Sequence, residues 1–120
     1  MAVLVAIAIP IFTAQLEKSR EATDAANLRA AYAELASAAV LGEAIDAKTE
    51  GNITINAAAK DAATYSAVVK LNQTQADWQN ASIKGSKIGS ADAGTPTAGG
   101  KGTITLTAAT GAAEIAYAAN

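Results

Sequence analysis

The chain has 120 residues, a net charge of −2, no Cys and no His. This length predicts one domain, and the lack of Cys excludes disulfides as the means of stabilising a small one. Without His or Cys the commonest catalytic bases, nucleophiles and transition-metal ligands are missing, and the eleven acidic residues form no cluster. We therefore expect a protein that is not an enzyme and that binds no metal or cofactor. The nine basic residues are scattered, which disfavours nucleic acid as a main partner.

The chain begins with a run in which residues 2–12 are all apolar. A helix needs about 17–25 apolar residues to cross a bilayer, so this run is too short to do so alone. It lacks the basic region and cleavage site of a secretory signal, and its apolar residues cover every helix face, whereas a core helix has one apolar stripe. The run is typical of the downstream half of a longer segment in a membrane or a filament core. The side chains expected to pack there are Val3, Leu4, Val5, Ile7, Ile9, Pro10, Ile11 and Phe12.

Residues 2 to about 41 predict one helix, because Ala, Leu, Glu, Gln, Lys and Arg dominate them. Such a helix would be about 60 Å long, far more than a small domain needs. Pro10 cannot donate a hydrogen bond to the Ala6 carbonyl, so we expect a kink or local melting there. In a fibre this break would let the helix extend. Gly42 is the expected C-terminal stop.

The predicted helix changes character near Leu28. Residues 13–27 are polar on most faces, with Arg20 and Asp24 spaced to form an ion pair, and we expect this segment at a membrane surface or between subunits. From Leu28 onward an apolar stripe appears, and Leu28, Tyr32 and Leu35 are expected to form the core between helix and sheet. The chain thus divides into a protruding helix half, residues 1–27, and a globular head, residues 28–120.

After a connecting loop at residues 42–52, the pattern predicts strands at 53–55, 64–71, 103–107 and 113–118, the last two joined by a hairpin ending at Gly111. Ile83 and Ile88 are consistent with a further short strand. A long N-terminal α-helix packed on a small antiparallel β-sheet is an α+β fold.

Two features of the head have both a structural and a functional interpretation. Trp78 is expected as a core anchor or a lid over the edge of the core, with ligand stacking as the alternative. Residues 89–102, rich in Gly, Ser, Thr, Ala and Pro, predict a mobile surface loop. This loop does not fit a phosphate-binding loop, because Gly100 stands where the Lys should be and no Ser or Thr follows Lys101.

The segment from Val3 to Glu34, VLVAIAIPIFTAQLEKSREATDAANLRAAYAE, resembles the N-terminal helix of type IV pilins, especially Gram-positive major pilins. The resemblance is strongest at residues 6–10, Ala-Ile-Ala-Ile-Pro, followed by an apolar residue and an aromatic one. Pilins of this kind begin with a mature Phe, a Glu a few residues later and about a dozen further apolar residues. None of these precedes Met1, so the resemblance implies a chain shortened at its N-terminus.

The resemblance implies a structural subunit that waits in the cytoplasmic membrane on its N-terminal helix. Pilus assembly machinery then stacks such subunits into a helical homo-oligomeric filament at the cell surface, which serves adhesion, motility or DNA uptake. One alternative is a pseudopilin of a secretion or competence apparatus. Another is a minor tip pilin acting as a binding module, for which only Trp78 and residues 89–102 are candidate contacts.

Overall fold

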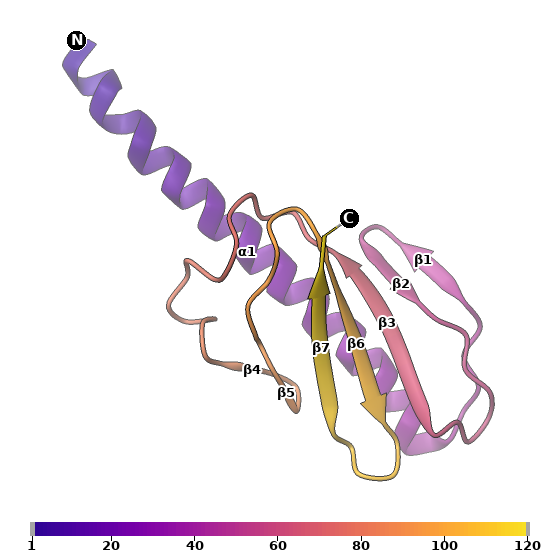
Figure 1. Ribbon diagram of the computed structural model, residues 1–120. Helices are drawn as coiled ribbons and strands as arrows, with labels where there is room; N and C mark the ends of the chain where they lie inside the picture. Colours follow the sequence, from indigo (N-terminus) through magenta and orange to yellow (C-terminus); the bar gives the residue numbers. More distant parts are fainter. Residues whose placement is uncertain (1, 120) are drawn as a thin grey trace.

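The computed structural model describes the backbone of residues 2–119 and the side chains of residues 13–119. One helix, α1 (Ala2–Leu41), precedes all the strands, and its N-terminal part projects beyond the sheet (Figure 1). The molecule is correspondingly elongated, with extents of 63 × 26 × 21 Å. The strands are β1 (Lys48–Glu50), β2 (Ile53–Ile55), β3 (Thr64–Lys70), β4 (Lys87–Ile88), β5 (Ala91–Asp92), β6 (Lys101–Thr107) and β7 (Ala113–Ala118).

Five of the strands form one antiparallel sheet in the order β1-β2-β3-β6-β7. The two long central strands pair from Thr64 opposite Thr107 to Lys70 opposite Lys101. The α+β class is therefore as predicted: one N-terminal helix lies on an antiparallel sheet. β2 and β7 have the predicted bounds, and β6 starts two residues earlier than predicted. The prediction of a plain loop at residues 42–52 is wrong, since β1 lies within it. β1 was missed because its three side chains are all exposed and have no apolar alternation.

The core lies between α1 and one face of the sheet, as alternation along the strands requires. Leu28 and Leu35 of the predicted core are fully buried there, and Tyr32 is half-buried and packs against the same cluster. The sheet contributes Ile55, Tyr65, Ala67, Val69, Ile104 and Leu106.

The two ends of α1 differ in how far they follow the prediction. At the C-terminal end Gly42 adopts a φ of 65°, its N–H donates to the Ala39 carbonyl, and that of Glu43 donates to the Ala38 carbonyl at 3.0 Å. This pattern is a Schellman motif, which needs a residue that tolerates positive φ. At the other end the backbone is helical through Pro10, so the expected local melting is not found in the single chain. A proline ring removes one hydrogen bond, and the flanking turns maintain the helix.

The eight side chains predicted to pack in a filament or membrane, Val3 to Phe12, lie outside the described residues. Within the part of the chain that the structure describes, no helix combines the length and apolar character needed to cross a bilayer.

The segment after β3 is better packed than predicted. Residues 89–102 are not a plain surface loop, because Ala91 and Ala93 are fully buried and β4 pairs with β5. Trp78 is the core anchor that the sequence predicted: its ring is buried and its indole N–H donates to the Ala93 carbonyl at 3.3 Å.

Candidate functional site

Three carboxylates on one face of α1, Glu17, Glu21 and Asp24, are buried against the loop that follows β3. Their spacing of four and three residues places them on one side of the helix. The sequence analysis placed this stretch in the protruding half of the helix, whereas one face of it is packed against the head from Glu17 onward. We refer to Glu17, Glu21 and Asp24 as the carboxylate clamp.

Asp24 holds the start of the loop. One carboxylate oxygen accepts hydrogen bonds from the backbone N–H of Asn72 at 2.8 Å and from its side-chain amide at 3.1 Å. The other oxygen accepts from the backbone N–H of Gln73 at 2.9 Å. Asn52, in the turn between β1 and β2, donates in turn to the Asn72 side chain at 3.1 Å. Asp24 thereby ties the helix to two separate turns at one end of the sheet.

Glu17 and Glu21 hold the next parts of the loop in the same way. Glu17 accepts from the backbone N–H groups of Thr74 at 2.9 Å and Gln75 at 3.0 Å, and from the Thr74 hydroxyl at 2.6 Å. Glu21 accepts from the backbone N–H groups of Gln79 at 2.9 Å and Asn80 at 2.8 Å. Each carboxylate of the clamp therefore binds two consecutive backbone N–H groups.

This geometry explains why three acidic side chains can be buried side by side. The loop has no sheet partner for these N–H groups, which would be costly to bury unpaired. Ionised carboxylates are strong acceptors, and hydrogen bonds to them are roughly twice as strong as neutral ones. The predicted Arg20–Asp24 ion pair does not form, because Asp24 faces the loop. Arg20 instead lies 3.5 Å from both the Glu17 carboxylate and the Thr74 hydroxyl.

The clamp also changes the boundary between the protruding helix and the head. The sequence placed this boundary between residues 27 and 28, whereas the helix is packed against the head from Glu17 onward. The freely projecting part of α1 is therefore shorter than predicted.

The environment shifts two of the clamp's pKa values in opposite directions. Burial raises the pKa of Glu17, but the hydrogen bonds from Thr74 and Gln75 outweigh it, and the net pKa lies below the usual 4.5. For Asp24, burial outweighs the hydrogen bonds from Asn72 and Gln73, so its pKa is raised above 3.8. Both oxygens of each clamp carboxylate accept hydrogen bonds from N–H or O–H groups of the loop, which is the geometry of a structural tie between helix and loop. Among residues 13–119, no three carboxylates are placed to share a metal ion.

The clamp was missed although the sequence contains a signal for it. Residues 17, 21, 24, 28, 31 and 35 follow one another at intervals of 4, 3, 4, 3 and 4, and all six are buried. The apolar stripe from Leu28 thus continues toward the N-terminus with acids in place of apolar residues. A search for apolar periodicity stops at Leu28 because it treats each acid as exposed.

Comparison of the chain with protein-family models, curated proteins and solved structures found no match.

Proposed function

We propose that the protein is a structural subunit of a type IV pilus-like filament, with a pilin-like fold, that sits in the membrane before assembly and at the cell surface afterwards. One observation carries the proposal: α1 leaves the head at Glu17 and continues as helix back to Ala2 (Figure 1). Its outermost residues, 2–12, are all apolar in sequence. The 15 residues from Ala2 to Leu16 correspond to about 22 Å of helix beyond the head.

An apolar helix projecting from a polar head has two favourable environments, lipid and a bundle of like helices. Transfer from the first to the second keeps the apolar surface dry, so packing between helices decides the energy of assembly. Heads attached to such helices would lie on the outside of the fibre. The filament is thus a homo-oligomer whose core consists of residues near the N-terminus.

The carboxylate clamp has a mechanical role in this proposal. A fibre under tension transmits load from the helix core to each head at the point where α1 enters it. Glu17, Glu21 and Asp24 lie at that point and join the helix to loop residues 72–80. Because several hydrogen bonds share the load at that point, they resist separation of the helix from the head better than a single contact would.

The same helix suits a pseudopilin, the first alternative, and the length of fibres on cells distinguishes the two. A tip pilin that binds ligand through Trp78 is disfavoured, because the ring of Trp78 is buried in the core.

The test compares the full chain with a chain reduced to residues 13–120 and with the double variant Ile7→Asp/Ile9→Asp. The full chain should sediment as oligomers without detergent and form fibres visible by electron microscopy, because contiguous exposed apolar surface drives association. Both variants should be monomeric and should melt as the full chain does, since the packed part of the helix begins at Glu17. A full chain that stays monomeric in dilute, detergent-free buffer would contradict the proposal.

A further inference from the structure

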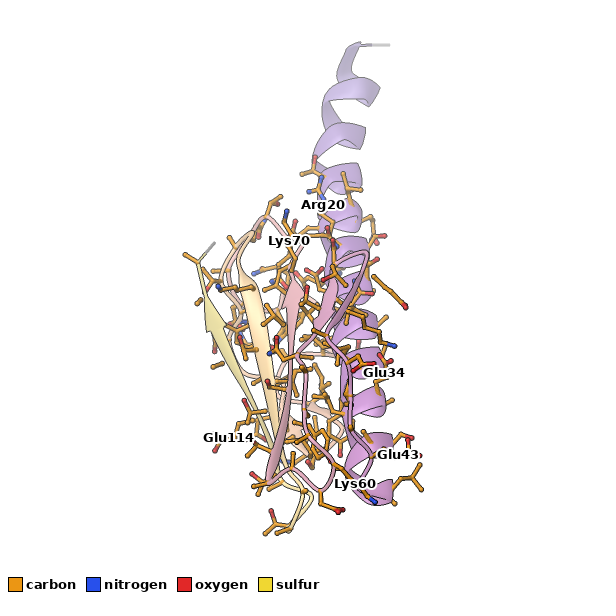
Figure 2. The ribbon with its side chains drawn as sticks, turned by 90° about the vertical axis from the view of Figure 1, so that its right-hand side faces the viewer. Arg20, Glu34, Glu43, Lys60, Lys70 and Glu114 are labelled. Atoms are coloured by element: carbon orange, nitrogen blue, oxygen red, sulfur yellow. The ribbon has the colours of Figure 1, made fainter. Side chains whose placement is uncertain are left out.

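The charged side chains of the head are segregated along its long axis. At the end from which α1 projects lie Lys18, Arg20, Lys70 and Lys101, and Figure 2 shows Arg20 and Lys70 there. We call these four residues the basic end. Three acidic side chains of the same region, Glu17, Glu21 and Asp24, face inward and bind backbone N–H groups. Glu50, the last residue of β1, is exposed at the same end of the sheet. The basic end therefore presents lysines to solvent, while the three carboxylates of the clamp are turned away from it.

Lys70 and Lys101 stand directly opposite each other on β3 and β6. Like charges in this position repel each other and weaken a sheet. Of the carboxylates whose side chains the structure describes, none forms an ion pair with Lys18, Lys70 or Lys101. Among residues 13–119, the basic end thus contains three lysines that form no ion pair.

The opposite end of the head is acidic. Glu43 follows the last turn of α1, and Asp61 lies beside it, with its backbone N–H bonded to the Gly42 carbonyl at 3.0 Å. Asp46 and Glu43 line an open cleft of ≈ 340 Å³ together with Glu34 and Lys48. Lys48 is paired with Glu34, which leaves Glu43 and Asp46 without a cation among residues 13–119. We call Glu43, Asp46 and Asp61 the acidic end; Lys60 is the one basic side chain labelled near it in Figure 2.

Exposed apolar side chains accompany both ends. Val40 and Leu41, 85% and 64% exposed, lie in the last turn of α1 next to the acidic end. Leu16, 39% exposed, lies one turn before Arg20 at the basic end. An apolar centre with a charged rim is the usual anatomy of a protein interface.

We propose that the acidic end of one subunit docks on the basic end of another copy of the same chain, with Val40 and Leu41 against the region of Leu16. The cleft beside Glu43 and Asp46 receives a lysine or arginine side chain of the neighbour. The inference rests on the proposed filament and adds a contact between heads to the packing of the helices. Leu16 and Leu41 are separated by 25 residues of helix, so contacting heads are displaced along the helix axis by about 37 Å.

The proposal commits to a second copy because both complementary surfaces are present on this chain. An anionic membrane or a nucleic acid would use the basic end but would leave the acidic end and its apolar pair unexplained. Contacts between unlike ends are heterologous, and because each one displaces the next head along the helix axis, they repeat as an open helical array, as a fibre requires.

The test is a charge swap in the full chain, read out as the critical concentration for fibre formation. The acidic-end variant is Glu43→Lys/Asp46→Lys and the basic-end variant is Lys70→Glu/Lys101→Glu. Each should raise the critical concentration about tenfold, because attraction between rim charges becomes repulsion. The quadruple variant restores complementarity and should return to within about twofold of the wild type. All four side chains are exposed, so the fold should be unaffected.

The control is Lys84→Glu/Lys87→Glu, which changes the net charge as the basic-end variant does but lies at and just before β4, where the two lysines pair with Asp77 and Asp92. It should assemble like the wild type. An unchanged critical concentration in both double variants would contradict this interface, and so would a quadruple variant that does not recover the wild-type value. Either result would leave the filament proposal unaffected. Loss of binding to anionic vesicles or to DNA in the basic-end variant, with unchanged assembly, would likewise assign that end to another partner. A wild-type chain that never associates removes the filament and this contact together.

Discussion

Replacement of Glu21 by alanine should destabilise the fold strongly, although Glu21 belongs to a stretch of the helix whose sequence is polar on most faces. Glu21 is fully buried, and its two carboxylate oxygens accept backbone N–H groups at 2.9 and 2.8 Å. A hydrogen bond to a charged group contributes about 1.5–3 kcal/mol, so two contribute about 3–6 kcal/mol. Because Gln79 is exposed, water can reach one of the freed N–H groups. We therefore expect the free energy of unfolding to fall by an amount near the lower value, about 3 kcal/mol.

This loss is a large part of the roughly 5–15 kcal/mol by which a domain is stable. For a domain of this size, about 3 kcal/mol lowers the melting temperature by roughly 12–24 °C. Urea unfolding followed by Trp78 fluorescence and thermal unfolding followed by circular dichroism measure it. Glu21→Gln keeps one carbonyl acceptor but turns an amide N–H toward a backbone N–H. Its free energy of unfolding should therefore lie between those of the wild type and Glu21→Ala.

The matched control is Glu34→Ala, the same substitution on the same helix. Glu34 is exposed and forms an ion pair with the exposed Lys48, which contributes little. Glu34→Ala should unfold at nearly the same temperature and urea concentration as the wild type. Equal unfolding midpoints for Glu21→Ala and Glu34→Ala would refute the reasoning, because the clamp would then add nothing to the free energy of unfolding.

Two further predictions concern the core and the pH dependence. Leu35→Ala should lower the free energy of unfolding by about 2–5 kcal/mol, because it leaves a cavity between α1 and the sheet; an unchanged urea midpoint would count against it. The lowered pKa of Glu17 means that its contribution is present above pH 4.5 and is lost as the pH falls below that value. Glu17→Gln should therefore flatten the fall in stability below pH 4.5 in a series of melts. The raised pKa of Asp24 has the opposite effect on stability, because its contribution is present at low pH and is lost as the pH rises. An identical pH profile for Glu17→Gln and the wild type would exclude this role.

Local pattern was sufficient to predict most of the elements of this protein. The helix from residue 2 to 41 follows from its composition, and its end follows from the one residue, Gly42, that tolerates a φ of 65° there. Alternation predicted β2 and β7 to the residue and most of β3 and β6. The stripe at Leu28 and Leu35 predicted which helix face meets the sheet. These features share a cause: each depends on residues within one or two turns, or within one strand, of each other.

The carboxylate clamp and the position of β1 were decided only by the tertiary structure. The partners of Glu17, Glu21 and Asp24 lie 48–59 residues away along the chain. Most of them are backbone N–H groups, which every residue but proline carries. No side-chain pattern in the loop indicates which of its N–H groups bind the carboxylates. The same three acids would be surface residues if the loop after β3 folded elsewhere, because burial of a carboxylate is tolerated only where donors are already in place. The chain's charge segregation has the same origin, since it arises when these acids turn inward and the lysines of β3 and β6 meet at one end.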